Sequence, residues 1–150
     1  MKTISKPKNN LGGLLKIWGV PNSVISVNKK TVTFSSTLNI YEIYCSPESI
    51  FLKEQPAVTS AGTHYITQVL GFVPENSELN KSAISDMDGK QFQVIIQDGN
   101  GNYLLVGNSF YPLKFSAELI QGKNTSDLAG YKIAFSGMVI SRAVFIDYPF

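Results

Sequence analysis

The side chains that most often carry out chemistry are scarce in this sequence. It contains one histidine, His64, and one cysteine, Cys45. Nucleophilic catalysis needs a serine or cysteine beside a base that is itself oriented, and a mechanism with two imidazoles is excluded. A single thiol also excludes an intramolecular disulfide and a metal site made of thiolates alone. We therefore interpret His64 as a hydrogen-bonded or solvated ring at the start of a strand, and Cys45 as a small buried residue.

Two segments rich in Asp, Asn and Gly, residues 86–89 and 98–102, resemble ion-binding loops. The second has oxygen-bearing side chains at alternate positions, as an EF-hand loop does. However, no glutamate stands at the twelfth position, where that loop needs its closing ligand, and no flanking helices are expected. A phosphate-binding loop is also excluded, because neither a Lys-Ser/Thr pair nor a helix follows the glycines. Both segments are typical of tight turns.

The acidic and aromatic residues suggest no other active site. Glycoside cleavage needs two acids that face one cleft, and nothing in the spacing selects a pair from Glu42, Glu48, Glu54, Asp86 and Asp147. Trp18, Tyr41, Tyr44 and Tyr65 have the side chains of a sugar-stacking platform, although aromatic residues in strands more often pack in the core. We predict no catalytic residue, no cofactor and no metal site.

The elements around these residues are mainly strands, because apolar residues recur with a period of two. Ten strands are expected, at residues 11–20, 23–27, 31–34, 38–45, 63–73, 91–97, 103–106, 113–119, 131–135 and 138–146. The last two are separated by a turn at Ser136-Gly137. Gly71 suggests a bulge or bend in its strand.

One helix is expected, from Ser77 to Met87. Asn76 or Ser77 is its N-cap, and an apolar face made of Leu79, Ala83, Ile84 and Met87 packs on the strands. The sequence therefore predicts a mainly β fold: a β-sandwich or barrel of about ten strands with one packed α-helix.

Composition supports one folded domain. The chain has 150 residues, 43% of them hydrophobic and only 16% charged, with a net charge of +2. A disordered chain would carry more charge and fewer apolar residues. No apolar run is long enough for a transmembrane helix, and the weak charge does not indicate a dedicated nucleic-acid binder. The low charge favours a surface that is partly covered in an oligomer.

The N-terminal segment differs from the rest of the chain. Residues 1–10 contain Lys2, Lys6 and Lys8 but few apolar residues, so we expect a flexible arm followed by a single domain over residues 11–150. No apolar stretch of signal-peptide type follows the lysines, which favours a cytoplasmic site of synthesis. The three lysines, with Gly12 and Gly13 as a swivel, are our candidate assembly residues; a solvated tail is the simpler alternative.

Several segments, taken together in order, carry a family resemblance. They are residues 12–18 with Pro21, residues 98–107, residues 112–116, and residues 130–137 with 143–146. The combination resembles virion proteins of tailed bacteriophages, in particular tail-tube-like proteins of phages that infect Bacteroides-type bacteria. The likeness extends over most of residues 11–147, although each motif alone is an ordinary strand or turn.

The resemblance implies a structural protein without enzymatic activity, made in the host bacterial cytoplasm and incorporated in the virion. Tail-tube-like proteins form rings, often hexameric, in which strands of neighbouring copies close a β-barrel around a channel for double-stranded DNA. Their loops and arms contact neighbouring subunits and other virion proteins, and no membrane is involved. Such channels are commonly acidic, and no acidic face can be identified here, so a head–tail connector or another virion component stays open.

A binding module is the alternative from a different functional class. It would be a carbohydrate-binding or adhesin domain of β-sandwich type that uses Trp18 and exposed tyrosines. Loss of ligand binding on mutation of Trp18, or binding on a glycan array, would favour this alternative.

Overall fold

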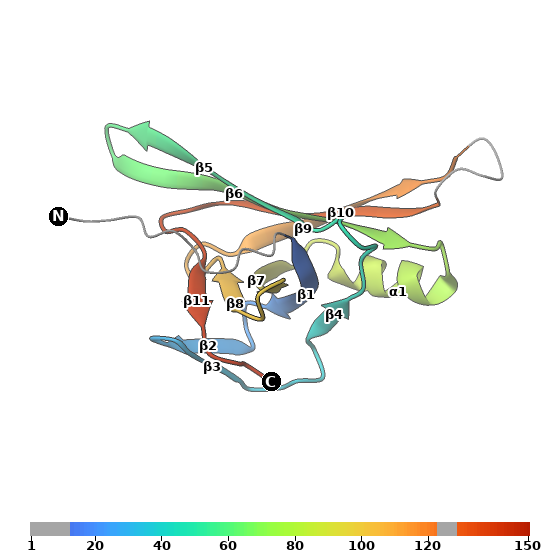
Figure 1. Cartoon of the computed structure of the whole chain (residues 1–150), viewed down its shortest axis with the longest axis horizontal. Coiled ribbons are helices and arrows are strands. Elements are labelled where there is room, and N and C mark those ends of the chain that lie inside the picture. The colour runs from blue at the N-terminus through green and yellow to red at the C-terminus, as the bar shows by residue number, and fades with distance from the viewer. Residues whose placement is uncertain (1–12, 123–128) are drawn as a thin grey trace.

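The computed structural model describes residues 13–122 and 129–150, which form a mainly β fold with one helix (Figure 1). The strands are β1 (Leu14–Pro21), β2 (Ile25–Asn28), β3 (Thr31–Phe34), β4 (Tyr41–Ile43), β5 (Phe51–Thr59), β6 (Gly62–Pro74), β7 (Gln91–Asp98), β8 (Tyr103–Val106), β9 (Leu113–Ile120), β10 (Gly130–Val139) and β11 (Val144–Ile146). The helix is α1 (Glu78–Met87). The predicted fold class is confirmed.

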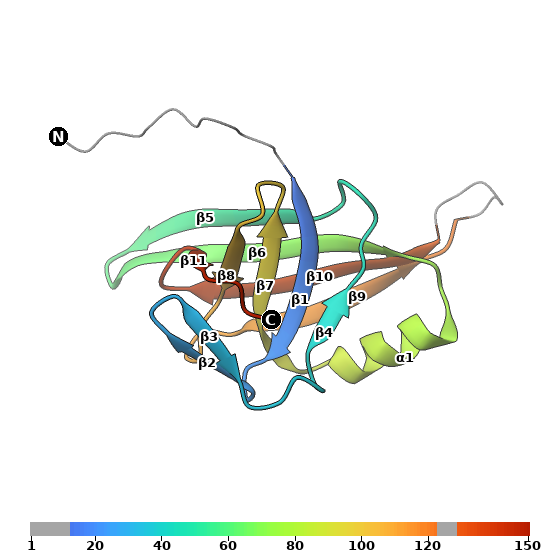
Figure 2. The same cartoon turned by 60° about the horizontal axis from the view of Figure 1, so that its bottom comes forward.

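The strands form two layers. The long layer has the order β5-β6-β10-β9, and the short layer contains β4, β1, β7, β8 and β11. All pairings between these strands are antiparallel. Strand β7 joins the layers, because it pairs with β1 along one edge and with both β8 and the start of β9 along the other. Figures 1 and 2 show the strands of the two layers crossing steeply.

The main core lies between the two layers. Phe92 from β7 packs against Phe115 and Phe135 of the long layer, with ring centroids 6.2 and 5.5 Å away. Alternate residues of β7 point to opposite faces, so Val94 and Ile96 join this core while Ile95 lies on the other side. A mainly apolar strand such as β7 is expected where both faces are covered.

A second, smaller core covers the outer face of the short layer. Ile95 and Trp18 pack there against the β2–β3 hairpin. Phe150 near the C-terminus lies over Trp18, with the ring centroids 4.9 Å apart, and stacks on Phe34 of β3. The short layer is therefore enclosed on both faces.

Several predicted strand boundaries are wrong. Strand β5 was not expected, because its polar residues and proline hide the alternation. Strand β10 runs straight through Ser136 and Gly137, so there is no turn at that position. A Cβ on Gly137 would lie 2.9 Å from the side chain of Leu113. The absence of a side chain at Gly137 therefore lets β10 lie close to the start of β9. The strand expected at residues 38–45 is confined to β4.

The prediction for Gly71 is also wrong. Its pairing with Ile133 continues the regular register of β6 and β10, so there is no bulge. The irregularity in the sheet lies in β1, between Leu14 and Lys16. A Cβ on Gly71 would instead lie 2.7 Å from the sulfur of Cys45. The glycine leaves space for that side chain.

The helix begins where expected, but it packs less than expected. The hydroxyl of Ser77 accepts a hydrogen bond from the backbone N–H of Asn80, which makes Ser77 the N-cap. Of the predicted apolar face, Met87 is buried and Ile84 half-buried, whereas Leu79 is 83% exposed. Only the C-terminal end of α1 is anchored in the core.

Candidate assembly surfaces

The long layer ends in two strand edges that have no partner among the described residues. Strand β5 pairs only with β6. Strand β9 pairs with β7 only through Leu113 and Lys114, so residues 115–120 have no strand on that side. Free edges of this kind present backbone N–H and C=O groups that can pair with another strand.

Pro56 limits the part of β5 that can pair. It has no N–H to donate and is tolerated in an edge strand when its nitrogen faces away from the neighbouring strand. The pairing-competent edge of β5 is therefore residues 51–55, about as long as the free stretch of β9 at 115–120.

The direction of the two edges is compatible with continuation of the sheet. The long layer contains an even number of antiparallel strands, so β5 and β9 run in opposite directions. A second copy placed beside the first in the same orientation would bring its β5 antiparallel to the first copy's β9. Every further copy repeats the same joint, which is the geometry of a head-to-tail interface.

The outer face of the long layer is not covered by a described element (Figure 1). The register aligns Phe51, Leu70, Ala134 and Ser116 in one row across this face. Lys53, Lys114 and Lys132 are exposed on the same face, and Glu118 lies beside Lys132. The face is therefore partly apolar and carries more basic than acidic groups, in contrast to the acidic channel that the phage resemblance implies.

A groove of about 550 Å³ opens between α1, β4 and the end of β6. Its apolar lining includes Ile43, Val73, Met87, Phe115 and Ile133, and all but Ile43 belong to the buried core. The N-terminal end of α1 is held by the amide of Asn80, which donates to the carbonyls of Pro74 and Glu75. The core residues in the lining of the groove remain buried.

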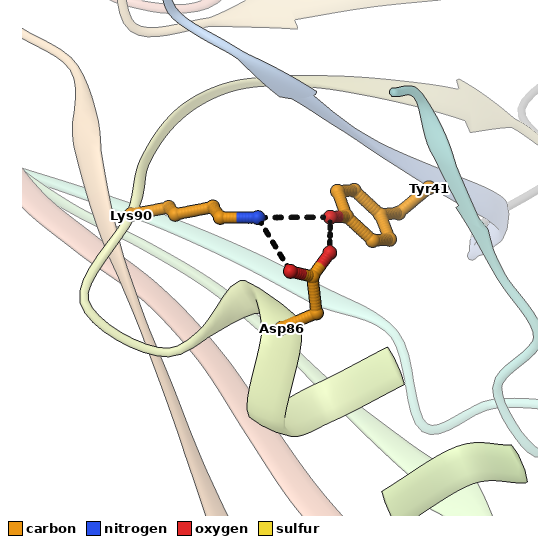
Figure 3. Close-up of polar contacts among 3 residues, drawn as sticks. All are labelled: Tyr41, Asp86 and Lys90. Atoms are coloured by element: carbon orange, nitrogen blue, oxygen red, sulfur yellow. Dashed lines mark hydrogen bonds and ion pairs between the residues drawn. The ribbon is translucent and has the colours of Figure 1, made fainter. Parts of the chain in front are cut away.

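A polar cluster stands at the groove beside Tyr41 (Figure 3). The Tyr41 hydroxyl donates to the carboxylate of Asp86, and the Lys90 ammonium donates to Asp86 at 2.8 Å and to the Tyr41 oxygen at 3.3 Å. The hydrogen bonds from Lys90 and Tyr41 lower the pKa of Asp86. Burial and the bond to Asp86 raise the pKa of Tyr41, so its hydroxyl stays protonated. These contacts tie α1 to β4.

The loop between β8 and β9 presents an aromatic side chain to solvent. The Asn108 side-chain oxygen accepts hydrogen bonds from the backbone N–H groups of Phe110 and Tyr111, both at 2.9 Å. The amide of Asn22 donates to the Ser109 carbonyl at 3.0 Å. Phe110 is nevertheless 87% exposed. A loop held by several hydrogen bonds therefore projects a large apolar side chain.

The predicted assembly residues lie mostly outside the described residues. Lys2, Lys6, Lys8 and Gly12 fall in residues 1–12. Gly13 is described: it is exposed, has a φ of +98°, and its carbonyl accepts a hydrogen bond from the Gly99 N–H at 3.0 Å. This hydrogen bond joins Gly13 to the β7–β8 turn. The role of the three lysines, Gly12 and Gly13 in assembly stays a prediction.

The chemistry-bearing residues of the sequence are dispersed. Cys45 is buried, which raises the pKa of its thiol to about 11 and keeps it protonated at neutral pH. His64 is on β6, on the outer face of the long layer opposite Ala57. Among the described residues, no group of three or more His, Cys, Asp or Glu side chains is arranged to hold a metal ion.

The Asp98 carboxylate forms hydrogen bonds within the turn at residues 98–102, to which it belongs. It accepts hydrogen bonds from the backbone N–H groups of Asn100 and Asn102 at 2.9 and 2.8 Å, and from the Asn102 amide at 3.0 Å. Burial alone would raise the pKa of Asp98, but these hydrogen bonds outweigh it and hold the pKa below its usual value. The turn interpretation of residues 98–102 is supported by this geometry.

Three of the acids considered for catalysis have structural contacts. Glu42 forms an ion pair with Lys16 at 3.2 Å. The side chain of Glu54 is 13% exposed, accepts a hydrogen bond from the backbone N–H of Ala143 and lies 3.8 Å from Arg142. Asp86 belongs to the cluster with Tyr41. These carboxylates hold elements together.

The residue that the binding-module alternative requires is covered. Trp18 is only 7% exposed because Phe150 and the β2–β3 hairpin lie over it. Tyr65 lies beneath Arg142, whose guanidinium carbon is 4.8 Å from the ring centroid. Of the four aromatic residues in the proposed platform, Tyr44 is the one with a largely exposed ring.

The two free edges, the groove and the Phe110 loop could not be recognised from the sequence. Each depends on which distant strands pair, and a single sequence does not reveal that register. The one local signal was the run of residues 107–111, where glycine and asparagine precede two consecutive aromatic residues.

Comparisons with family models, with curated proteins and with solved structures gave no match for this chain. Within residues 13–122 and 129–150, no helix is both long and apolar enough to span a membrane. The surfaces described above and the resemblance of the sequence segments are therefore the features that indicate a function.

Proposed function

We propose that this protein is a structural subunit of a bacteriophage virion, without enzymatic activity, that assembles into a ring of the tail tube or of the head–tail connector. The observation that carries the proposal is the long layer, whose two free edges are similar in length and run antiparallel to each other. Pairing of β5 with the β9 of the next copy satisfies both edges, and a closed ring leaves none exposed.

The resemblance of the sequence to tail-tube-like proteins supplies the biological setting. In such a ring the long layers of all copies form one continuous barrel, and one face of that barrel lines the channel for double-stranded DNA. The exposed lysines on the outer face of the long layer would attract phosphate groups if that face lined the channel. Because the channels of tail-tube-like proteins are commonly acidic, this positive charge is a reason to propose the head–tail connector as well as the tail tube.

The test blocks the β5 edge and the β9 edge separately, each with a proline substitution. Of two neighbouring strand residues, one directs its N–H to the paired strand and the next directs it outward. Since the nitrogen of Pro56 faces outward, so does that of Leu52, and Leu52→Pro removes a donor from the β5 edge. On β9, proline is placed at Ala117 and at Glu118 in turn, and the variant that keeps its fold is used.

Analytical ultracentrifugation at rising concentration gives the readout, with Leu52→Ala and Glu118→Ala as matched controls that keep the N–H. We expect the wild type and both controls to assemble, and each proline variant alone to remain monomeric. A mixture of the two proline variants should stop at a dimer, because each contributes one intact edge. Full assembly of either proline variant, or a wild type that stays monomeric up to millimolar concentration, contradicts the proposal.

The setting in a virion has an independent check. The encoding gene is expected to lie beside genes for portal and tail proteins, and the protein should be detected by mass spectrometry in purified virions. A gene surrounded by polysaccharide-utilisation functions, together with binding on a glycan array, would support the carbohydrate-binding alternative instead.

A further inference from the structure

A second pocket, separate from the α1 groove, opens on the outer face of the short layer and has a volume of about 390 Å³. Its most buried residues are Gln93 of β7 and Leu105 of β8. Its walls come from β2, from the β8–β9 loop and from the segment between β10 and β11. Figures 1 and 2 both show β2 close to β8 and β11. A pocket of this volume suits a small ligand.

Gln93 brings an unpaired hydrogen-bond acceptor to this pocket. It is 1% exposed, and its side-chain N–H donates to the Asn22 side-chain oxygen at 2.8 Å. The amide of Asn22 donates to the Ser109 carbonyl, so its oxygen is the atom that faces Gln93. The side-chain oxygen of Gln93 is left without a hydrogen-bond partner among the described residues. Buried acceptors are rarely unpaired, so a ligand with an O–H or N–H donor fits here.

Arg142 is the one charged residue in the described lining of the pocket. One of its guanidinium nitrogens lies 3.8 Å from the Glu54 carboxylate, beyond hydrogen-bond distance. A guanidinium carries five N–H donors, and its planar shape matches a carboxylate. Glu54 offsets part of the positive charge, which favours a ligand with a single negative charge over a phosphate dianion.

The rest of the lining is mixed in chemistry. Ser26, Ser109 and Ser141 place hydroxyl groups on three different walls. Phe110, which is 87% exposed, and Val144 supply apolar surface beside them. Such a lining suits a ligand that has several hydroxyl groups and also C–H surface.

We infer that this pocket binds a small organic carboxylate with several hydroxyl groups, that is, a sugar acid. Its carboxylate pairs with Arg142, and one of its hydroxyl groups donates to the side-chain oxygen of Gln93. The inference goes beyond the proposed function, because no lining residue of the pocket belongs to the free edges at residues 51–55 and 115–120.

Titration calorimetry of the full chain with three probes tests the ligand class. D-glucuronate carries both the carboxylate and the hydroxyl groups, glucose lacks the carboxylate, and propanoate lacks the hydroxyl groups. We expect glucuronate to bind about tenfold more tightly than either of the other two, since a hydrogen bond to a charged group contributes about that factor. Equal affinity for glucose or for propanoate, or no measurable binding of glucuronate, would overturn the inference.

Variants locate the binding site. Arg142→Gln removes the charge at an exposed position, and Gln93→Met removes the acceptor at a similar length. Each variant should weaken glucuronate binding about tenfold, with a thermal melt to verify the fold. Glu54→Gln is the matched control, because it removes a charge next to Arg142 but outside the pocket lining. Its affinity for glucuronate should be unchanged or higher.

Undiminished binding by Arg142→Gln, or an equal loss in Glu54→Gln, would contradict the site. The titration is repeated with Leu52→Pro, whose affinity for glucuronate should equal that of the wild type. A wild type that stays monomeric would contradict the ring and leave the pocket unaffected, whereas loss of glucuronate binding would contradict the pocket alone. The two proposals can therefore fail separately.

Discussion

At the scale of single residues, Gly71 determines how closely β6 approaches the chain at Cys45. A Cβ at this position would lie 2.7 Å from the Cys45 sulfur and 3.4 Å from the side chain of Ile17. We expect Gly71→Ala to destabilise the protein by about 1–3 kcal/mol through overpacking. Cys45→Ala removes the obstructing sulfur, so the double variant should be more stable than the sum of the two single effects.

Urea unfolding of the two single variants and the double variant measures this coupling. Additive effects within about 0.5 kcal/mol would show that Gly71 and Cys45 do not interact. The same cycle distinguishes a steric role for Gly71 from the bulge that the sequence suggested.

Protonation of Asp98 at acidic pH is expected to lower the free energy of unfolding. Because its pKa is lowered in the folded state, its contribution to stability is present above the unfolded pKa of about 4 and is lost as pH falls through the folded pKa. Asp98→Asn keeps the shape but removes the charge, and should cost about 1–2 kcal/mol at neutral pH. The difference in free energy of unfolding between the wild type and Asp98→Asn should become smaller as pH falls below about 4.

Urea unfolding at several pH values between about 7 and 2.5 provides the measurement for Asp98. If the two proteins kept a constant difference in free energy of unfolding over that range, the charge of Asp98 would have no part in stabilising the β7–β8 turn.

At the scale of elements, the C-terminal residues act as a cover for the short layer. Phe150 lies 4.9 Å from Trp18 and 5.6 Å from Phe34, between ring centroids. Phe150→Ala should lower stability by about 1–2 kcal/mol and admit water to the indole. Since Trp18 is the single tryptophan, its fluorescence emission reports on this position alone and should shift to longer wavelength.

Tyr148→Ala is the matched control for Phe150, because Tyr148 contacts Tyr103 and Phe150 but has no ring contact with Trp18. Its emission shift should be clearly smaller. An equal shift in both variants would mean that the whole segment, and not the Phe150 ring, shields Trp18.

The elements that could be predicted from the sequence are those with local signals. The N-cap Ser77, the β2–β3 hairpin and the turn at residues 98–102 each follow from side chains that are close in sequence. Strand β5 was missed because its polar residues and Pro56 are features of an edge, which only the pairing with β6 defines. The turn expected at Ser136 was wrong because Gly137 meets Leu113, a residue distant in sequence.

At the scale of the whole molecule, the N-terminal arm remains a prediction. Residues 1–10 contain three lysines and little apolar surface to offset an ordering cost of about 1–2 kcal/mol per residue. Deletion of residues 2–9 should leave the melting temperature nearly unchanged and weaken assembly. A thermal melt and sedimentation of the truncated chain test both parts; a large loss of stability with intact assembly would place the arm within the fold.

The position of β1 in the sheet has a consequence for synthesis. Trp18 of β1 pairs with Ile95 of β7, about 80 residues further along the chain. At roughly 5–20 residues per second, the ribosome takes about 4–16 seconds to produce that partner. Until then β4 is the one strand that can pair with β1 among the described residues, and the edge of β1 that later pairs with β7 is open to other nascent chains. The interval before β7 emerges is therefore when this protein is most exposed to aggregation and most open to chaperones.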